Sequence, residues 1–394
     1  MIRRITPPAL LALVLTGSAA LAQPVPCGGD FTAFLSDMQD EAEAEGVPSE
    51  AAQRFFSALS RDPSVIAADQ RQGIFQAPFI EFSQRLISSN RLERGRQMLD
   101  RHAEIFDRIA RDYGISHGIL LAFWAFETDY GQIQGDYNTA NALATLSHDC
   151  RRPELFQPQL IAAARLHARG DLPLDTTGAW AGEIGMVQML PEDILENGID
   201  GDGDGHVTLK TSAPDALMSG AAMLSDLGWR AGEPWLEEVQ MPAEFDWYLT
   251  GLETQRPASD WAAMGVSARD GQIDAPDLPA SILLPQGRGG PAFLAYPNFS
   301  VLFEWNKSFT YVLTAAYFGT RLEGAPALDT GNPAPGLGPD EMVRLQEKLQ
   351  DRGYDVGEAD GILGAGTRSA VRDVQRELGL PADAWPTAEL LNRL

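Results

Sequence analysis

The sequence predicts a mainly α-helical protein with a small helical module at its C-terminus, and three observations support this. Apolar residues recur at helical spacing through residues 31–324. Residues 325–339 lose that period and consist largely of Pro, Gly and small residues, which is typical of a linker. Residues 340–394 regain the period in two short stretches, 342–349 and 370–378.

Two segments of the long region show the helical period most clearly. Residues 31–45 carry apolar side chains on one stripe, and residues 91–108 continue in the same way, so we expect a helix over each. The apolar positions are Phe31, Phe34, Leu35 and Met38 in the first segment and Leu92, Met98, Leu99 and Ile105 in the second.

Residues 1–22 have the pattern of an export signal. Arg3 and Arg4 form a basic start, residues 9–15 are all apolar, and residues 20–22 give a small-x-small site, so we expect cleavage before residue 23. The apolar run is too short to span a bilayer. We therefore expect a soluble periplasmic protein without a transmembrane segment. A buried N-terminal helix is the alternative.

The net charge of −25 limits the partners of the protein. Nucleic-acid phosphates and anionic membrane surfaces attract Lys and Arg, whereas this chain has 30 basic and 55 acidic side chains. We therefore expect no nucleic acid and no anionic membrane surface as a partner.

The chain has two cysteines, Cys27 and Cys150. In an exported protein two cysteines suggest one disulfide, which would join the N-terminal tail to the segment after residue 145. Two free, buried thiols are the alternative. The residues before Cys27 do not match a lipoprotein signal, so we expect no lipid anchor.

Glu127 directly follows an entirely apolar run, residues 119–126. A helix that is apolar on every side is buried, and we expect Ser116 as its N-cap and Gly131 as its C-terminal stop. A carboxyl group at the end of a buried helix loses hydration, which raises its pKa. Such an acid can donate a proton near neutral pH, as cleavage of a glycosidic bond requires. The alternative is a glutamate that caps the helix or forms an ion pair.

A second catalytic carboxylate is not evident in the sequence. Asp129 is close to Glu127 along the chain, but residues two apart do not share a helix face. Most glycosidases use two carboxylates, although in some families the substrate assists. A single buried acid therefore suggests a mechanism in which the substrate takes part.

Four motifs follow one another between residues 31 and 324. They are E-T-D-Y-G at 127–131 with N-A-L-A-T-L at 141–146, the arginine pair Arg151 and Arg152, the glycine-bounded loop 178–191, and Y-P-N-F at 296–299 with W-N-K-S at 305–308. In these motifs and their order, residues 31–324 resemble the lytic murein transglycosylase B family.

The resemblance implies a lysozyme-like helical catalytic domain over residues 23–324. It implies that the enzyme cuts peptidoglycan glycan strands between N-acetylmuramic acid and N-acetylglucosamine without water. Glu127 would protonate the leaving oxygen and then act as base while the muramic 6-hydroxyl attacks C1, which leaves a 1,6-anhydro end. We expect a monomer. The residues expected to bind substrate are Tyr130, Arg151, Arg152, Gln188, Trp305 and Asn306.

The chain departs from the family pattern near the expected site. Ala179 stands in place of a serine, Glu183-Ile184 in place of Ala-Met, Met189-Leu190 in place of Phe-Met, and Ala222-Met223 in place of Asn-Tyr. The lost hydroxyl groups remove hydrogen bonds, which affects rate and substrate preference more than the reaction class. Two alternatives stay open: a hydrolytic muramidase on the same scaffold and a non-catalytic peptidoglycan-binding scaffold protein.

Residues 200–206, D-G-D-G-D-G-H, match the start of an EF-hand calcium loop. Position twelve, a bidentate Glu in an EF-hand, is Thr211 here. The transglycosylase family closes a longer loop with a later aspartate, which implies Asp215 as the last ligand. An exposed acidic turn without metal is the alternative. The expected ligands of a structural Ca²⁺ are Asp200, Asp202, Asp204, His206 through its backbone carbonyl, and Asp215.

Residues 340–394 resemble the small three-helix type of peptidoglycan-binding domain. A weak second site on the same polymer raises the effective substrate concentration, so the module would tether the enzyme. A helical cap on the catalytic domain is the alternative. The resemblance rests on Leu345, Gln346, Leu349, the loop D-G-I-L-G at 360–364, Thr367, Arg368, Ala370, Val371 and Gln375.

Overall fold

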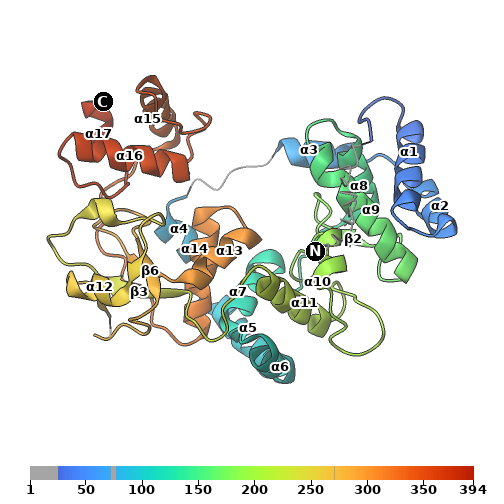
Figure 1. The fold of residues 1–394 in the computed structure, drawn as a ribbon, viewed down its shortest axis with the longest axis horizontal. Helices are drawn as coiled ribbons and strands as arrows, with labels where there is room; N and C mark the ends of the chain where they lie inside the picture. Colours follow the sequence, from blue (N-terminus) through green and yellow to red (C-terminus); the bar gives the residue numbers. More distant parts are fainter. Residues whose placement is uncertain (1–24, 72–76, 270) are drawn as a thin grey trace, which may run out of the picture.

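A computed structural model describes residues 25–71, 77–269 and 271–394 of the chain. The predicted signal peptide lies outside these residues. Helices dominate the described part (Figure 1), which confirms the mainly α prediction, and none of the helices described is long and apolar enough to cross a membrane. They are α1 (Phe31–Ala44), α2 (Ser49–Ser57), α3 (Pro63–Gln70), α4 (Phe79–Leu86), α5 (Ser89–Arg101), α6 (Ala103–Tyr113), α7 (His117–Thr128), α8 (Thr139–His148), α9 (Pro153–Arg169), α10 (Pro191–Asn197), α11 (Ala213–Asp226), α12 (Ala258–Ala263), α13 (Pro297–Trp305), α14 (Phe309–Leu322), α15 (Pro339–Asp351), α16 (Ala365–Glu377) and α17 (Ala388–Arg393), with a short 3-10 helix at Trp247–Leu249.

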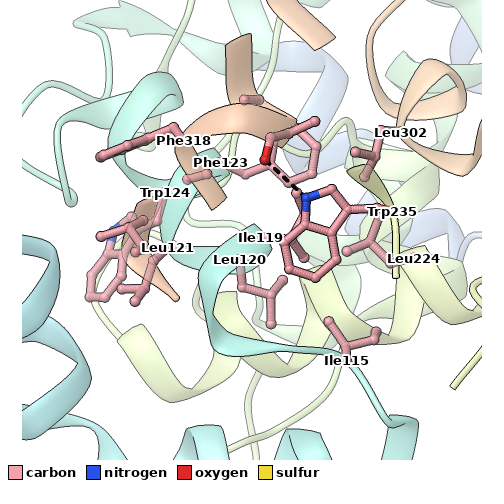
Figure 2. Close-up of a cluster of buried hydrophobic side chains, with 14 of the residues drawn as sticks. Ile115, Ile119, Leu120, Leu121, Phe123, Trp124, Leu224, Trp235, Leu302 and Phe318 are labelled. Atoms are coloured by element: carbon pink, nitrogen blue, oxygen red, sulfur yellow. Dashed lines mark hydrogen bonds between the residues drawn. The ribbon is translucent and has the colours of Figure 1, made fainter. Parts of the chain in front are cut away.

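Helix α7 is the centre of the first of two large cores. Its residues from Gly118 to Ala125 are all buried, and it packs most extensively against α14. Ser116 is the N-cap, as predicted, because its hydroxyl oxygen accepts the Gly118 N–H. Figure 2 shows this cluster, in which the indole N–H of Trp235 donates to the carbonyl of Ala316 at 2.9 Å.

The second core is formed by α1, α2, α8, α9 and the loop 178–190. The predicted stripe on α1 belongs to it, since Phe34, Leu35 and Met38 are buried there. Met186 and Trp305 pack against both cores. The boundary between the two cores therefore runs past Met186 of the glycine-bounded loop motif and Trp305 of the last motif.

Segment 91–108 forms two helices, not the single helix that was predicted. Helix α5 ends before His102 and α6 begins after it, because His102 has φ −115° and ψ 27°, outside the helical range. The apolar period did not reveal the break, since Leu92 of α5 and Phe106 of α6 face the same core.

A five-stranded antiparallel sheet occupies part of the region that was expected to be mostly helical. Its strand order is β4-β6-β7-β3-β5, and at its centre Ile282 pairs with Leu294. The strands β6 and β7 are short apolar runs, which periodicity alone cannot distinguish from a buried helix. The strands are β3 (Leu236–Gln240), β4 (Arg256–Pro257), β5 (Ser267–Ala268), β6 (Pro279–Leu283) and β7 (Ala292–Ala295), while β1 (Tyr137–Asn138) and β2 (Thr177–Gly178) form a separate pair.

The C-terminal module consists of α15, α16 and α17 and lies beside the five-stranded sheet region (Figure 1). Arg372 of α16 donates to the carbonyl of Thr250 at 2.5 Å and pairs with Glu253 at 2.7 Å. The preceding linker is held as well, because Trp385 Nε1 donates to the carbonyl of Ala334 at 2.8 Å. The module is therefore docked on the catalytic region, as in the alternative of a helical cap, while its predicted binding of peptidoglycan as a tether is a separate matter.

Candidate active site

Glu127 lies in the last turn of α7. Its Oε1 accepts a hydrogen bond from the hydroxyl of Tyr311 at 2.5 Å. Burial raises the pKa of Glu127 to about 7; hydrogen bonds from Tyr311 and Trp305 act in the opposite direction, and the charge of Glu183 raises the pKa further. The carboxyl group therefore keeps much of its proton near neutral pH, which suits a general acid. No basic side chain among the described residues forms an ion pair with it, so the ion-pair alternative finds no support.

Tyr311 was not identified from the sequence. It lies in the first turn of α14, whose N-cap is Ser308 in the motif W-N-K-S. A helix starting at Ser308 was readable from the sequence, but the approach of this helix to Glu127 is a tertiary contact. The sequence therefore indicated the helix, but nothing in it indicated that Tyr311 contacts Glu127.

The turn after Glu127 points the neighbouring side chains away from it. Asp129 adopts a left-handed conformation (φ 52°) and ends α7 two residues before the predicted stop at Gly131. Its carboxylate pairs with Arg91 at 3.3 Å and Arg94 at 2.6 Å. Although burial acts the other way, these arginines hold the pKa of Asp129 below its usual value. Asp129 is thus committed to an ion pair and is no second catalytic acid.

Tyr130, predicted to bind substrate, is buried in the turn that follows Glu127. The residue is only 6% exposed, and its hydroxyl donates to the carbonyl of Arg91 at 2.8 Å. The guanidinium of Arg94 lies over its ring. Tyr130 therefore stabilises the turn behind Glu127, and its role in substrate binding stays a prediction.

The loop 178–190 is fastened to the end of α7. Thr128, next to Glu127, donates its hydroxyl to the carbonyl of Met186 at 2.7 Å. Within the loop, Ile184 and Met189 form a β-bridge. Gln188 has φ 53° and donates its side-chain amide to the carbonyl of Gly185 at 2.8 Å. This hydrogen bond uses one N–H of the amide, so the second N–H and the carbonyl oxygen of Gln188 are left for other contacts.

Trp305 and Asn306 lie at the end of α13, near the start of α14. The indole of Trp305 stacks on Phe123 with ring centroids 4.4 Å apart and an interplanar angle of 12°. Asn306 accepts the Ser308 N–H at 2.9 Å. Both side chains are half-buried, so each has a structural contact and an accessible portion.

Arg151 and Arg152 lie at the start of α9 and share one partner. Both guanidinium groups pair with the buried carboxylate of Asp69 on α3, Arg152 at 2.5 Å. Arg152 also lies over the ring of Phe156, 5.2 Å from its centroid. Each arginine side chain is about two-fifths exposed, at 43% and 41%, so both can still offer N–H groups to a ligand.

A cavity of about 480 Å³ lies between the catalytic region and the C-terminal module. Residues 307–310, which lead into α14 and towards Tyr311, line one side of it. Residues 362–365, from the glycine-rich loop of the module, line another. The catalytic region and the module therefore contribute to one cavity.

The acidic loop brings together three of the five expected metal ligands. Oxygen atoms of Asp200, Asp202 and Asp204 all lie within 4.8 Å of one another. The structure separates Asp215 from this group: it is fully buried, and its two oxygens accept the N–H groups of Gly201 at 2.9 Å and Thr208 at 2.7 Å. Asp215 therefore stabilises the loop from inside, and its role as the closing ligand of a bound ion stays a prediction.

His206 follows the three aspartates at the end of the glycine-rich stretch. Its ring Nδ1 lies 3.0 Å from Asp171, and this hydrogen bond raises the pKa of His206. The ring therefore has a partner outside the loop. Only the backbone carbonyl of His206 stays a candidate ligand, as expected.

Cys27 and Cys150 are joined by a disulfide in the structure. A backbone hydrogen bond beside the disulfide joins the same two segments, since the Gly28 N–H donates to the carbonyl of His148 at 2.9 Å. The bond ties the start of the described chain to the end of α8. Thiol labelling of the denatured, unreduced protein would show whether the bond forms in the exported molecule.

A buried acid at the end of an apolar helix, between two helical cores, defines a lysozyme-like enzyme that cleaves glycosidic bonds. The chain belongs to the family described as "Transglycosylase SLT domain", which matches residues 30–320. Residues 339–394 match "Putative peptidoglycan binding domain". The predicted class, a lytic transglycosylase of peptidoglycan, is thereby confirmed.

Three known proteins illustrate the relationship. Membrane-bound lytic murein transglycosylase B of Escherichia coli K12 is 27% identical over 245 residues, which span 61% of this chain and 66% of that protein. SltB3 from Pseudomonas aeruginosa in complex with NAG-anhNAM-pentapeptide is 35% identical, with a TM-score of 0.85 over 93% of this chain and 99% of that one. Escherichia coli Slt35 in complex with calcium is 25% identical, with a TM-score of 0.62 over 76% of this chain and 96% of that one.

Proposed function

We propose that the enzyme cleaves the bond between N-acetylmuramic acid and N-acetylglucosamine without water, in the periplasm. Glu127 gives its proton to the glycosidic oxygen as the bond from C1 to that oxygen breaks. The muramic 6-hydroxyl then attacks C1 and returns its proton to Glu127, so the enzyme is restored and a 1,6-anhydro end forms. The observation that carries this proposal is the buried carboxyl of Glu127, whose pKa of about 7 suits both donation and recovery of a proton.

The hydrolytic alternative requires a second carboxylate that holds a water molecule. Glu183 is the acid whose charge acts on Glu127, but its Oε2 is shielded from solvent and has no hydrogen-bond partner. A shielded oxygen is poorly placed to activate water. The attached 6-hydroxyl, by contrast, has a high effective concentration. The complex of SltB3 with NAG-anhNAM-pentapeptide adds support, because that relative binds an anhydro sugar.

Digestion of purified peptidoglycan in ¹⁸O-labelled water tests the proposal. Ring closure adds no water, so the new muramic ends should carry no label and should be lighter by one water than hydrolysis products. Labelled, reducing muramic ends would assign the chain to the muramidases instead. Release of no fragments at all from intact sacculi and isolated strands would favour the scaffold alternative.

We also propose a structural Ca²⁺ in the acidic loop. Three converging carboxylates fit a hard cation that prefers oxygen ligands, and they would repel one another without it. Asp200, Asp202 and Asp204 would hold the ion through their side chains and His206 through its carbonyl. Bound there, it would neutralise the loop in front of α11 and take no part in the reaction.

A further inference from the structure

The cavity between the catalytic region and the C-terminal module is lined by the first residues of two helices. One wall includes Ser308, the N-cap of α14, and another includes Gly364, the N-cap of α16. Gly364 has no side chain that could bond to the first N–H groups of α16. Because a helix N-terminus carries a partial positive charge and free N–H donors, both helices favour a negative group in the cavity.

Arg368 of α16 lines the same cavity and adds a full positive charge. Within the described residues its contacts are with neutral groups: Nη2 donates to the carbonyl of Pro285 at 3.0 Å, and the guanidinium lies over the ring of Phe309, 4.9 Å from its centroid. Its Nε has no hydrogen-bond partner. The side chain is half-buried, and the loss of hydration lowers the pKa of Arg368 to about 10. A cation in such a place is costly without a counter-ion.

The other charged side chains that line the cavity already have partners. Arg372 pairs with Glu253 at 2.7 Å, and Lys307 pairs with a glutamate on α13. Asp383 is buried and accepts backbone and amide N–H groups, beyond ion-pair distance of Arg368. The guanidinium of Arg368 is therefore available to an anion that enters the cavity.

Much of the remaining wall is apolar. Leu252 and Phe303 contribute from the catalytic region and Leu363 from the module. The cavity of about 480 Å³ has access to solvent, since the side chain of Lys307 at its edge is 71% exposed. An apolar pocket with a few polar groups is typical of a site for a small ligand. A fitting occupant combines a carboxylate with small apolar groups.

We propose that this cavity binds the peptide stem of peptidoglycan, with a carboxylate of the stem against Arg368 and its alanine methyl groups against the apolar wall. The inference rests on the proposed function for the identity of the substrate. In a strand that carries stems the sugars are uncharged, so the carboxylates lie on the peptides. A guanidinium forms strong, charge-assisted hydrogen bonds with such a group. The stem would then lie beside the first turn of α14, which also carries Tyr311.

Isothermal titration of the whole protein with the free stem pentapeptide tests the proposal. Arg368→Met should weaken binding by about tenfold or more, because it removes the charge and keeps an apolar side chain. Arg344→Met, on the exposed face of α15 in the same module, is the control and should bind the peptide as the unaltered protein does. The same peptide with its carboxylates amidated should also bind about tenfold more weakly.

Equal affinity for the amidated peptide, or an unchanged affinity of a folded Arg368→Met protein, would overturn the proposal. Binding of acetate or inorganic phosphate without binding of the peptide would overturn it as well, because the cavity would then be a site for small anions. NMR of the unaltered protein needs no variant to fold. The peptide should shift the Nε–H signal of Arg368 and leave that of Arg344 in place, and an unmoved Arg368 signal would also contradict the proposal.

The titration involves no bond cleavage, so its result does not depend on the role of Glu127. Glu127→Gln should bind the free peptide with the affinity of the unaltered protein. A fully active Glu127→Gln enzyme would refute the proposed function while leaving the peptide site to be judged by the titration alone.

Discussion

Glu127 obtains its chemistry from side chains that are distant in the sequence. The apolar run before it was sufficient to predict burial and a raised pKa, because both depend on the local helix. Tyr311 and Glu183 were not predicted as partners, because their approach to Glu127 depends on how α14 and the loop 178–190 pack. The burial of Tyr130 was not predicted for the same reason, since its motif gives no sign that its hydroxyl turns inward to Arg91.

Removing the Tyr311 hydroxyl should shift the pH profile upward. The hydrogen bond from Tyr311 stabilises the carboxylate of Glu127 and lowers its pKa. In Tyr311→Phe the pKa of Glu127 should rise above about 7, by about one unit. The alkaline limb of kcat/KM should move to higher pH while kcat falls, because the carboxylate formed during the reaction is less stabilised. A shift to lower pH would contradict this assignment.

Glu127 should also make the stability of the protein depend on pH. Its folded pKa of about 7 exceeds the ordinary value of 4.5, so ionisation costs the folded state more than the unfolded state. The destabilisation is absent below pH 4.5, grows as pH rises, and is complete above 7, at about 3 kcal/mol. Glu127→Gln should therefore raise Tm at pH 8 and leave it nearly unchanged at pH 4. Equal Tm values at pH 8 would argue against a buried carboxylate.

Among the secondary-structure elements, the sequence predicted the presence of helices better than the residues at which they end, and it did not predict the sheet. The N-cap Ser116 was found because capping is a local interaction. The break at His102 was missed because the apolar stripe continues through it. The strands β6 and β7 were missed because short, fully buried strands lack an alternating pattern. Local rules therefore succeed where the neighbours along the chain determine the conformation.

The acidic loop is an element whose stability should depend on calcium. Binding to the folded state alone stabilises by about 2.7 kcal/mol at a hundredfold excess over Kd. Millimolar Ca²⁺ should therefore raise Tm, and Asp202→Ala with Asp204→Ala should abolish the increase. Asp37→Ala with Asp40→Ala, on the exposed face of α1, is the matched control and should retain it. An unaltered Tm with calcium would speak against a bound ion.

In the whole molecule the C-terminal module is docked on the catalytic region, an arrangement that the sequence offered only as the alternative of a helical cap. The docked module lines a cavity together with residues 307–310, which adjoin the catalytic helix α14. Composition predicted the linker, because Pro and Gly disfavour regular structure there. It could not reveal the docking, which depends on long-range contacts such as that of Arg372 with Thr250.

Loss of the Arg372 contacts should loosen the module. Arg372→Met removes the hydrogen bond to Thr250 and the ion pair with Glu253. We expect faster amide hydrogen exchange at 250–253 and in α16, with exchange in α7 unchanged. Arg344→Met is the control, because its ion pair with Glu341 is long, at 3.7 Å, and exposed. Unchanged exchange in Arg372→Met would show that other contacts hold the module in place.

The most direct test of the account compares the muropeptides that the unaltered protein and Glu127→Gln release from purified peptidoglycan, measured by mass at pH 6. Gln keeps the shape of the side chain but can neither donate nor recover the proton. The account predicts 1,6-anhydro products from the unaltered protein and at least a hundredfold less of them from a folded Glu127→Gln protein. Comparable yields from both proteins, or mainly reducing muramic ends from the unaltered one, would contradict it.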